Sequence, residues 1–74
     1  MEERIARILE SVDERILTYD GDNLFDAGLL DSFLVIGLVG DLEDEFDIKI
    51  DAKLVYENNF KTKDAIIALV RQLI

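Results

Sequence analysis

The chain has 74 residues, of which 50% are hydrophobic, 17 are acidic and 8 are basic, so its formal net charge is −9. It contains no cysteine, histidine, proline or tryptophan, which excludes a thiolate nucleophile, a disulfide, a zinc site built on Cys and His, and an imidazole base. A net charge of −9 repels nucleic acid and anionic lipid, so the sequence predicts one small acidic domain, residues 1–74, that binds basic protein surfaces.

The N-terminus, Met1–Arg7, has early acidic residues and lacks the apolar segment of a signal peptide. The longest apolar run, Phe33–Gly40, has eight residues, whereas a membrane-spanning helix needs about 20. We therefore expect a cytoplasmic protein that does not insert into membranes. A domain of this size gains only about 3–5 kcal/mol from its core, which favours a compact helical bundle.

The first predicted element is a helix from residue 2 to about residue 17. Its apolar residues fall at relative positions 0, 3, 4, 7 and 11, a spacing that places them on one face of an α-helix. These residues are Ile5, Ile8, Leu9, Val12 and Ile16.

A long loop is predicted next, over residues 18–31, because the helical spacing stops there and turn-forming residues appear, including Gly21 and Gly28. Loops of about fourteen residues are uncommon in compact domains and often have a function. Four apolar side chains should hold this loop against the core: Leu24, Phe25, Leu29 and Leu30.

The second predicted helix begins at Asp31–Ser32, two residue types that cap helix N-termini, and ends at about Phe46. Its inward face repeats the spacing of the first helix with Val35, Leu38, Val39, Leu42 and Phe46. Acidic residues should occupy its solvated side.

The rest of the chain predicts a connector, one short helical turn and a final helix. Residues 48–50 alternate like a strand, but a single strand without a partner is not a sheet, so we predict an extended connector. Residues 53–57 could form a helical turn with Leu54 or Tyr56 facing inward and Asn58–Asn59 at its end. Thr62 should cap a last helix, whose inward residues are Ile66, Leu69, Val70 and Leu73 and whose C-terminal dipole suits Arg71.

The Asp31–Ser32 pair is the first candidate site. An Asp-Ser pair before an apolar helix is most often only a capping device. The hydroxyl of Ser32 would nevertheless be exposed after a loop, and an anion attached to it would meet free backbone N–H groups and the positive end of the helix dipole. A phosphodiester on Ser32 would therefore be well placed.

The outer face of the second helix is the next candidate. At about 100° per residue, Phe33, Ile36, Gly37, Gly40 and Asp44 lie together opposite the inward stripe. Two glycines inside a helix cost about 1 kcal/mol each relative to alanine, so they either let another surface approach closely or leave the helix suboptimal. The face is predicted to be a docking surface, the alternative being that the loop or the third segment covers it.

Two acidic groups have competing interpretations. Asp20, Asp22 and Asp31 match positions 1, 3 and 12 of a calcium loop, but Leu24 and Phe25 stand where a ligand and a glycine are needed, so no metal site is predicted. A second group flanks the apolar strip and would steer a basic partner, although such clusters are often only solvated: Asp41, Glu43, Asp44, Glu45 and Asp47.

Taken together, these features resemble the acyl carrier protein family. The resemblance covers nearly the whole chain: the acidic composition, the approach from Phe25 to Gly28, the motif Asp31–Ser32–Phe33, the stripe that ends at Phe46, the connector and the terminal helix from Thr62. It implies an all-α four-helix bundle of acyl carrier type, with three longer helices and one short helix. The segment Gly28–Phe33 is most similar to D-alanyl and other stand-alone aminoacyl carriers.

The resemblance implies a carrier rather than an enzyme. Ser32 would bear a covalent 4'-phosphopantetheine derived from coenzyme A, and Asp31 would assist its transfer by a phosphopantetheinyl transferase. Acyl or aminoacyl ligases and transferases with basic surfaces would dock on Phe33, Ile36, Gly37, Gly40, Asp41 and Asp44. The carrier would be a monomer that presents an acyl or aminoacyl thioester to the enzymes of a biosynthetic pathway.

Three alternatives remain open from the sequence. The first is a D-alanyl carrier protein for teichoic acid modification in the cell wall, which is a special case of the carrier. The second is a small helical interaction module that never carries an arm, and the third is a calcium-responsive domain.

Overall fold

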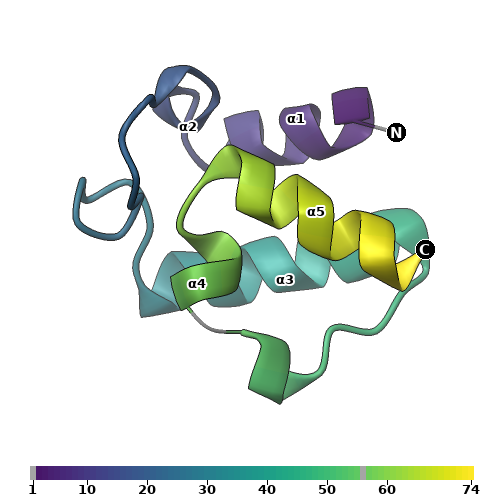
Figure 1. Cartoon of the computed structure of the whole chain (residues 1–74). Helices are drawn as coiled ribbons and strands as arrows, with labels where there is room; N and C mark the ends of the chain where they lie inside the picture. The colour runs from purple at the N-terminus through teal and green to yellow at the C-terminus, as the bar shows by residue number, and fades with distance from the viewer. Residues whose placement is uncertain (1, 56) are drawn as a thin grey trace.

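A computed structural model describes residues 2–55 and 57–74, and every regular element in that part of the chain is helical. The elements follow in the order α1 (Glu2–Val12), α2 (Arg15–Thr18), α3 (Ser32–Phe46), the 3₁₀ turn η1 (Ala52–Leu54), α4 (Glu57–Phe60) and α5 (Lys63–Leu73) (Figure 1). The predicted all-α fold with three longer helices is confirmed.

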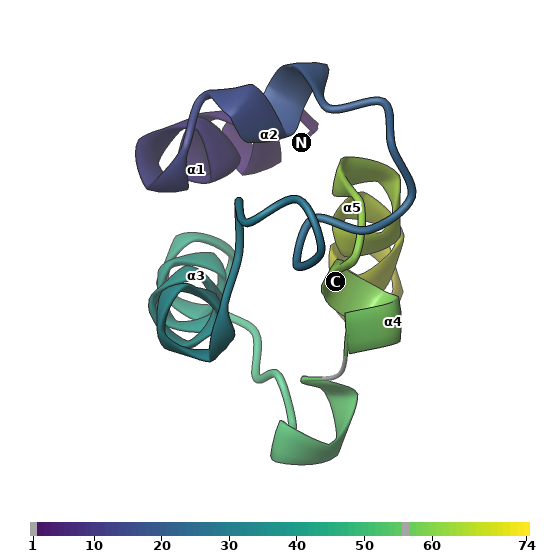
Figure 2. The ribbon, with the colours of Figure 1, turned by 90° about the vertical axis from the view of Figure 1, so that its left-hand side faces the viewer.

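The three longer helices surround one apolar core. Figure 2 shows α1 across the top, with α3 and α5 on either side below it, and α1 contacts both of them. Fourteen side chains are buried there, with no polar one among them in the described residues: Ile5, Leu9, Ile16, Leu24, Leu29, Leu30, Val35, Leu38, Leu42, Ile50, Phe60, Ile66, Leu69 and Val70. The apolar stripes predicted from helical spacing therefore meet one another in the core.

The first helix is shorter than predicted, because the chain changes its hydrogen bonding at Asp13. Asp13 still donates to the carbonyl of Leu9, but the N–H of Ile16 returns to the carbonyl of Asp13, three residues back, as in a 3₁₀ turn. The prediction of one continuous helix to about residue 17 is thus wrong. Ile16 nevertheless remains fully buried, so the inward stripe survives the break.

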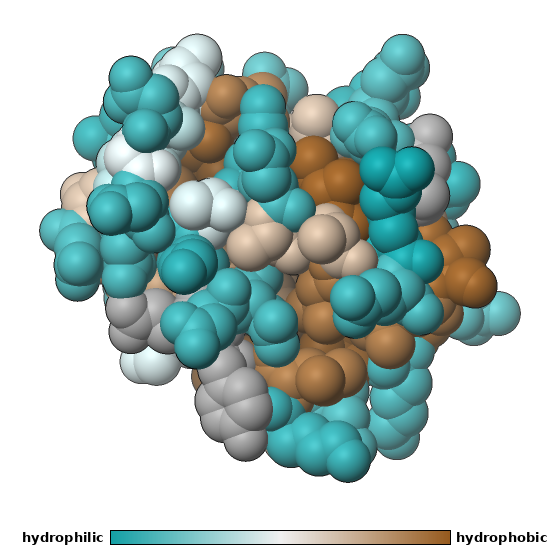
Figure 3. Space-filling model, viewed as in Figure 1, coloured by the Kyte–Doolittle hydropathy of each residue, from teal (hydrophilic) through white to brown (hydrophobic). Residues whose placement is uncertain are grey.

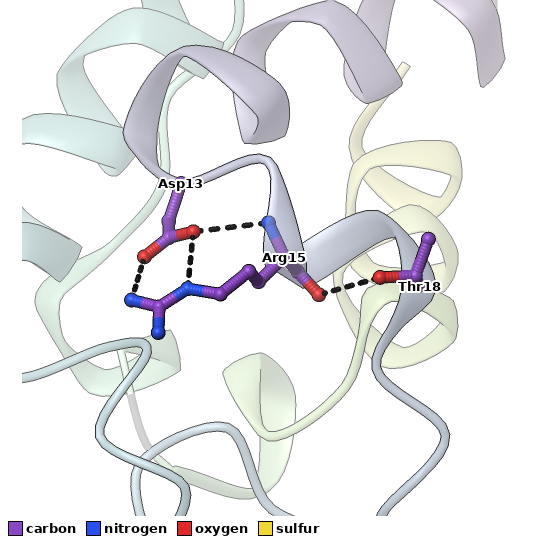
Figure 4. Close-up of polar contacts among 3 residues, drawn as sticks. All are labelled: Asp13, Arg15 and Thr18. Carbon is purple, nitrogen blue, oxygen red and sulfur yellow. Dashed lines mark hydrogen bonds and ion pairs between the residues drawn. The ribbon is translucent and has the colours of Figure 1, made fainter.

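The Asp13 carboxylate stabilises this break. Its Oδ1 accepts hydrogen bonds from the backbone N–H of Arg15 at 2.9 Å and from the guanidinium Nε at 3.0 Å, while Oδ2 accepts from Nη2 at 2.6 Å (Figure 4). Hydrogen bonds from the side chain and the backbone of Arg15 lower the pKa of Asp13 to about 2. An aspartate that caps a backbone N–H two residues on offers the chain an alternative to the helical ladder.

The C-terminal end of α3 is closed by a residue in the left-handed conformation. Asp47 has φ 52° and ψ 49°, and its N–H donates to the carbonyl of Glu43. The predicted extended connector follows, and it is held by the Glu43 carboxylate, which accepts the N–H of Ile50 at 2.7 Å. Glu43 is therefore committed to the fold, although the sequence placed it in a solvated cluster.

The short helical region differs from its prediction. The sequence indicated one turn over residues 53–57 that ends at Asn58–Asn59, whereas η1 precedes Tyr56 and α4 continues through both asparagines to Phe60. The side-chain amide of Asn59 donates to the carbonyl of Leu54 at 2.8 Å, which joins the two turns. Leu54 is half-buried, and Tyr56 lies outside the described residues.

Two arginines connect α1 to the other two longer helices. Arg4 donates to the Glu45 carboxylate at 2.6 Å and to the Glu45 carbonyl at 2.8 Å, and its guanidinium lies 4.7 Å from the centre of the Phe46 ring. Arg71, in the last turn of α5, pairs with Glu2 at 3.2 Å. Thr62 caps α5 as predicted, because its hydroxyl accepts the N–H of Ala65.

The surface mixes charged and apolar side chains. Figure 3 shows apolar surface among hydrophilic side chains on the face that carries α5, as expected where so small a domain has a half-hydrophobic sequence. Within residues 2–55 and 57–74, no helix has both the length and the apolar character needed to cross a membrane.

Candidate functional site

The start of α3 is built by Asp31 and not by Ser32. Asp31 has an extended backbone, and its Oδ1 accepts the N–H of Leu34 at 2.7 Å, while its carbonyl accepts the N–H of Val35 at 2.9 Å. Asp31 is therefore the N-cap, and Ser32 is the first helical residue. The capping function that the sequence left open for the pair belongs to the aspartate alone.

Ser32 has an exposed side chain. In the part of the chain that the structure describes, no hydrogen bond engages its hydroxyl, nor the backbone N–H groups of Ser32 and Phe33. These donors point out of the first turn of a fifteen-residue helix, where the helix dipole favours negative charge. A phosphodiester on the Ser32 oxygen would meet both the free N–H groups and the positive end of the helix dipole.

The loop before Ser32 is ordered, as its apolar residues predicted. Leu24, Leu29 and Leu30 are buried, and the carbonyl of Leu24 accepts the N–H groups of Leu29 at 3.0 Å and Leu30 at 3.3 Å. Gly28 turns the chain between them with φ 78°, a conformation that strains other residues. The loop crosses the end of the bundle at which α3 begins (Figure 2).

The outer face of α3 is open to solvent. Phe33 is 81% exposed and Ile36 is 70% exposed, so neither the loop nor the described part of the third segment covers them. A Cβ atom built on Gly37 or Gly40 would contact nothing within 4 Å. The packing of this chain therefore does not require glycine at either position.

The acidic cluster divides into two groups. Glu43 holds the connector, Glu45 pairs with Arg4 and Asp47 closes α3, so these three residues act within the fold. Asp41 and Asp44 are exposed and belong to none of the ion pairs among the described residues. Both line a groove of about 520 Å³ between α1 and α3, together with Arg4, Arg7, Ile8, Ser11 and Glu45.

The acidic residues of the loop do not gather around a common point. Among the residues that the structure describes, no three acidic side chains lie close enough together to hold a metal ion. Asp31, which would be the last ligand of the calcium pattern, instead uses its carboxylate to cap α3.

Tyr19 and Asn23 make a contact within the loop that the sequence did not predict. The Tyr19 hydroxyl donates to the carbonyl of Asn23 at 2.9 Å and accepts its N–H at 3.2 Å. The local signal was a tyrosine two residues before Gly21, because a glycine lets a ring pass close to the backbone.

Comparisons with known proteins identify the family of the chain. Residues 2–60 match the family model described as "Phosphopantetheine attachment site". The D-alanyl carrier protein of Streptococcus gordonii is 32% identical over 72 residues, which covers 92% of this chain and 91% of the relative. D-alanyl carrier proteins of Streptococcus thermophilus show the same identity and coverage. No solved structure matched the chain.

The family decides between the alternatives that the sequence left open. A helical module without an arm and a calcium-responsive domain are both set aside, because the matched region is a phosphopantetheine attachment domain and covers most of the chain. Proteins of this kind are modified by a phosphopantetheinyl transferase and work with ligases and transferases. The chain belongs to the phosphopantetheine attachment family, and it is a carrier protein that bears covalent 4'-phosphopantetheine and is not an enzyme.

Proposed function

We propose that Ser32 is the attachment residue for 4'-phosphopantetheine. The observation that carries this proposal is the uncommitted hydroxyl of Ser32 at the first position of α3, beside two free N–H groups and after a cap made by Asp31. The residues present fit the group, because its phosphodiester is an anion and this helix end favours anions. Asp31 fixes the position of Ser32 and leaves its second carboxylate oxygen available to the modifying enzyme.

The bound group would supply the thiol that this cysteine-free chain lacks, and that thiol can hold an acyl or aminoacyl group as a thioester. The protein's own part is to expose Ser32 on a rigid helix and to present the surface beside it. Residues 1–74 would act as one monomeric carrier domain in the cytoplasm, without nucleic-acid or membrane partners.

The outer face of α3 is the proposed docking surface for the modifying and loading enzymes. Phe33 and Ile36 offer apolar area next to Ser32, and Gly37 and Gly40 allow a partner to approach the helix backbone. Asp41 and Asp44 follow further along α3 with no ion-pair partner in the described residues, so a basic enzyme surface would complement them. Docking should weaken as ionic strength rises, because exposed charges are screened.

We propose an aminoacyl cargo, with D-alanine as the first candidate. This cargo is supported by the D-alanyl carrier proteins to which the chain is similar over nearly its full length, and by the resemblance of Gly28–Phe33 to stand-alone aminoacyl carriers. A D-alanyl carrier for teichoic acid modification is the specific version of this proposal.

Mass spectrometry tests the attachment site. The protein is incubated with coenzyme A and a broadly acting phosphopantetheinyl transferase, and one arm should be added to the wild type and to Ser11→Ala but none to Ser32→Ala. Ser11 is the matched control, because it is the other serine of the chain and its hydroxyl donates to the Ile8 carbonyl on α1. An unmodified wild type, or an arm on Ser32→Ala, would refute the proposal.

The cargo is tested with the modified protein. A D-alanine:carrier protein ligase with ATP and D-alanine should add one D-alanyl group, while a malonyl transferase with malonyl coenzyme A should add little. Preferential loading of malonate would contradict the aminoacyl proposal and leave the attachment at Ser32 untouched.

A further inference from the structure

The loop before Ser32 contains a closed contact that the attachment chemistry does not explain. The Tyr19 hydroxyl makes two hydrogen bonds to the backbone of Asn23, donating to the carbonyl at 2.9 Å and accepting the N–H at 3.2 Å. Both residues are half-buried. We refer to these two bonds as the Tyr19 clasp.

The clasp leaves no space for a side chain at position 21. A Cβ atom on Gly21 would lie 2.3 Å from the Tyr19 hydroxyl oxygen and 2.4 Å from Cζ of the same ring. Non-bonded heavy atoms cannot approach so closely, so the Tyr19 ring would have to move. Glycine at position 21 is thus a condition for the closed clasp.

Asn23 connects the Tyr19 clasp to the segment that precedes Ser32. Its side-chain oxygen accepts the N–H of Phe25 at 2.9 Å, and the next residue, Leu24, donates to the Lys61 carbonyl between α4 and α5 at 2.6 Å. The Leu24 carbonyl accepts the N–H groups of Leu29 and Leu30, and Leu30 directly precedes Asp31. Tyr19 is therefore linked to the residue before the N-cap by hydrogen bonds at Asn23 and Leu24, two residues that are adjacent in the chain.

We propose that Tyr19 is a positioning residue for the modification of Ser32, a step that rests on the proposed attachment site. Tyr19 lies in the loop and acts on Ser32 only through the segment that it holds. A transferase that recognises the loop together with Ser32 meets a closed conformation in advance and does not have to order it during docking. When the clasp opens, only a fraction of the carrier molecules is competent, and the apparent affinity falls by that fraction.

Tyr19→Phe is the direct test, because it removes the hydroxyl and keeps the ring. With coenzyme A and a broadly acting phosphopantetheinyl transferase, we expect the KM for the carrier to rise about fivefold, the factor that corresponds to about 1 kcal/mol, with kcat unchanged. Thr18→Val is the matched control, since it removes a neighbouring hydroxyl that donates only to the Arg15 carbonyl at 3.4 Å (Figure 4). Its KM should equal that of the wild type.

Gly21→Ala approaches the same clasp from its other side. Its added methyl group should displace the tyrosine ring and raise KM by a similar factor. The double variant Tyr19→Phe/Gly21→Ala should be no worse than the poorer single variant, because both act on one contact. Additive effects would show that the two residues act separately and would overturn the clasp as the cause.

A general loss of stability must be separated from positioning. The control is Ile67→Val, in the middle of α5. Its assay temperature is adjusted until its fraction of folded protein equals that of Tyr19→Phe. The KM of Ile67→Val should then stay at the wild-type value. In addition, Tyr19→Phe that already carries its arm should be loaded by a D-alanine:carrier protein ligase with an unchanged KM. If KM rose equally in Ile67→Val and Tyr19→Phe, Tyr19 would act only through overall stability. The same would follow if Tyr19→Phe raised KM equally for attachment of the arm and for loading by the ligase.

The result also separates this inference from the attachment itself. A wild type that takes no arm refutes Ser32 as the attachment residue and this inference with it. A wild type and a Tyr19→Phe variant that are modified with equal KM refute the positioning role and leave Ser32 in place.

Discussion

The two faces of α3 follow different rules. On the inward face, Leu38 and Leu42 are fully buried and Val35 is 6% exposed, whereas Phe33 and Ile36 on the outer face are 81% and 70% exposed. Both faces are apolar, so hydrophobicity alone does not decide which one the bundle buries. The difference teaches that the bundle is held by one side of this helix, while the apolar side chains on the other side are open to solvent.

The largest contrast should come from truncating one residue on each face. Leu38→Ala should lower the free energy of unfolding by about 3 kcal/mol, because it leaves a cavity in the core. Ile36→Ala should change it by no more than about 0.5 kcal/mol, since its side chain is exposed. Urea unfolding monitored by circular dichroism measures both values, and similar losses at the two positions would remove the distinction between the faces.

Replacing the glycines of the outer face should stabilise the protein. Gly37→Ala and Gly40→Ala should each raise the free energy of unfolding by about 1 kcal/mol, because alanine is the better helix former and its Cβ would contact nothing. Gly28→Ala is the control, and it should destabilise because φ is 78° at that position. A loss of stability in either helix variant would mean that the fold itself requires these glycines.

The N-cap at the start of α3 should have an effect of similar size on the free energy of unfolding. Asp31→Ala should lower the free energy of unfolding by about 1 kcal/mol, because the N–H of Leu34 loses its acceptor. Thr62→Ala should lower it by as much, because the N–H of Ala65 in α5 loses its acceptor. Asp31→Ser should keep the cap but lose the carboxylate. If Asp31→Ser is stable but modified slowly by the transferase, the aspartate has a second role at Ser32; normal modification would limit Asp31 to capping.

The smallest change in stability is expected at Phe33. Phe33→Ala should alter the free energy of unfolding by no more than about 0.5 kcal/mol, yet raise the KM of the loading enzyme severalfold, because apolar contact beside Ser32 would be lost. Steady-state loading of the modified protein measures this, with Ile74→Ala as an exposed control at the end of the chain. An unchanged KM would take Phe33 out of the docking surface.

Most of the fold could be predicted because it depends on local patterns. The limits of α3 follow from Asp31 and from the apolar spacing up to Phe46, and the start of α5 follows from Thr62. The exposure of Ser32 also followed from the sequence, since a loop precedes it and an apolar helix comes after it. The helix N-terminus, which is the basis of the attachment proposal, is therefore a local property of the chain.

What the sequence did not predict depends on contacts between distant or unlike groups. The stripe from Ile5 to Ile16 continues through the break at Asp13, because a single 3₁₀ turn leaves Ile16 facing inward. Asn59 would usually end a helix, but here its amide bonds to the Leu54 carbonyl. Arg4 and Glu45 lie far apart in sequence, so the division of the acidic cluster required the structure.

The hydrogen bond from Leu24 to the Lys61 carbonyl has a consequence for the order of folding. Contacts between α1 and α2 and between α4 and α5 join neighbouring segments, so they close short loops and we expect them to form early. The bond from Leu24 must wait until the α4–α5 junction exists. We therefore expect the segment before Ser32 to take its shape last, so that a transferase would meet a properly formed site only on chains that have finished folding.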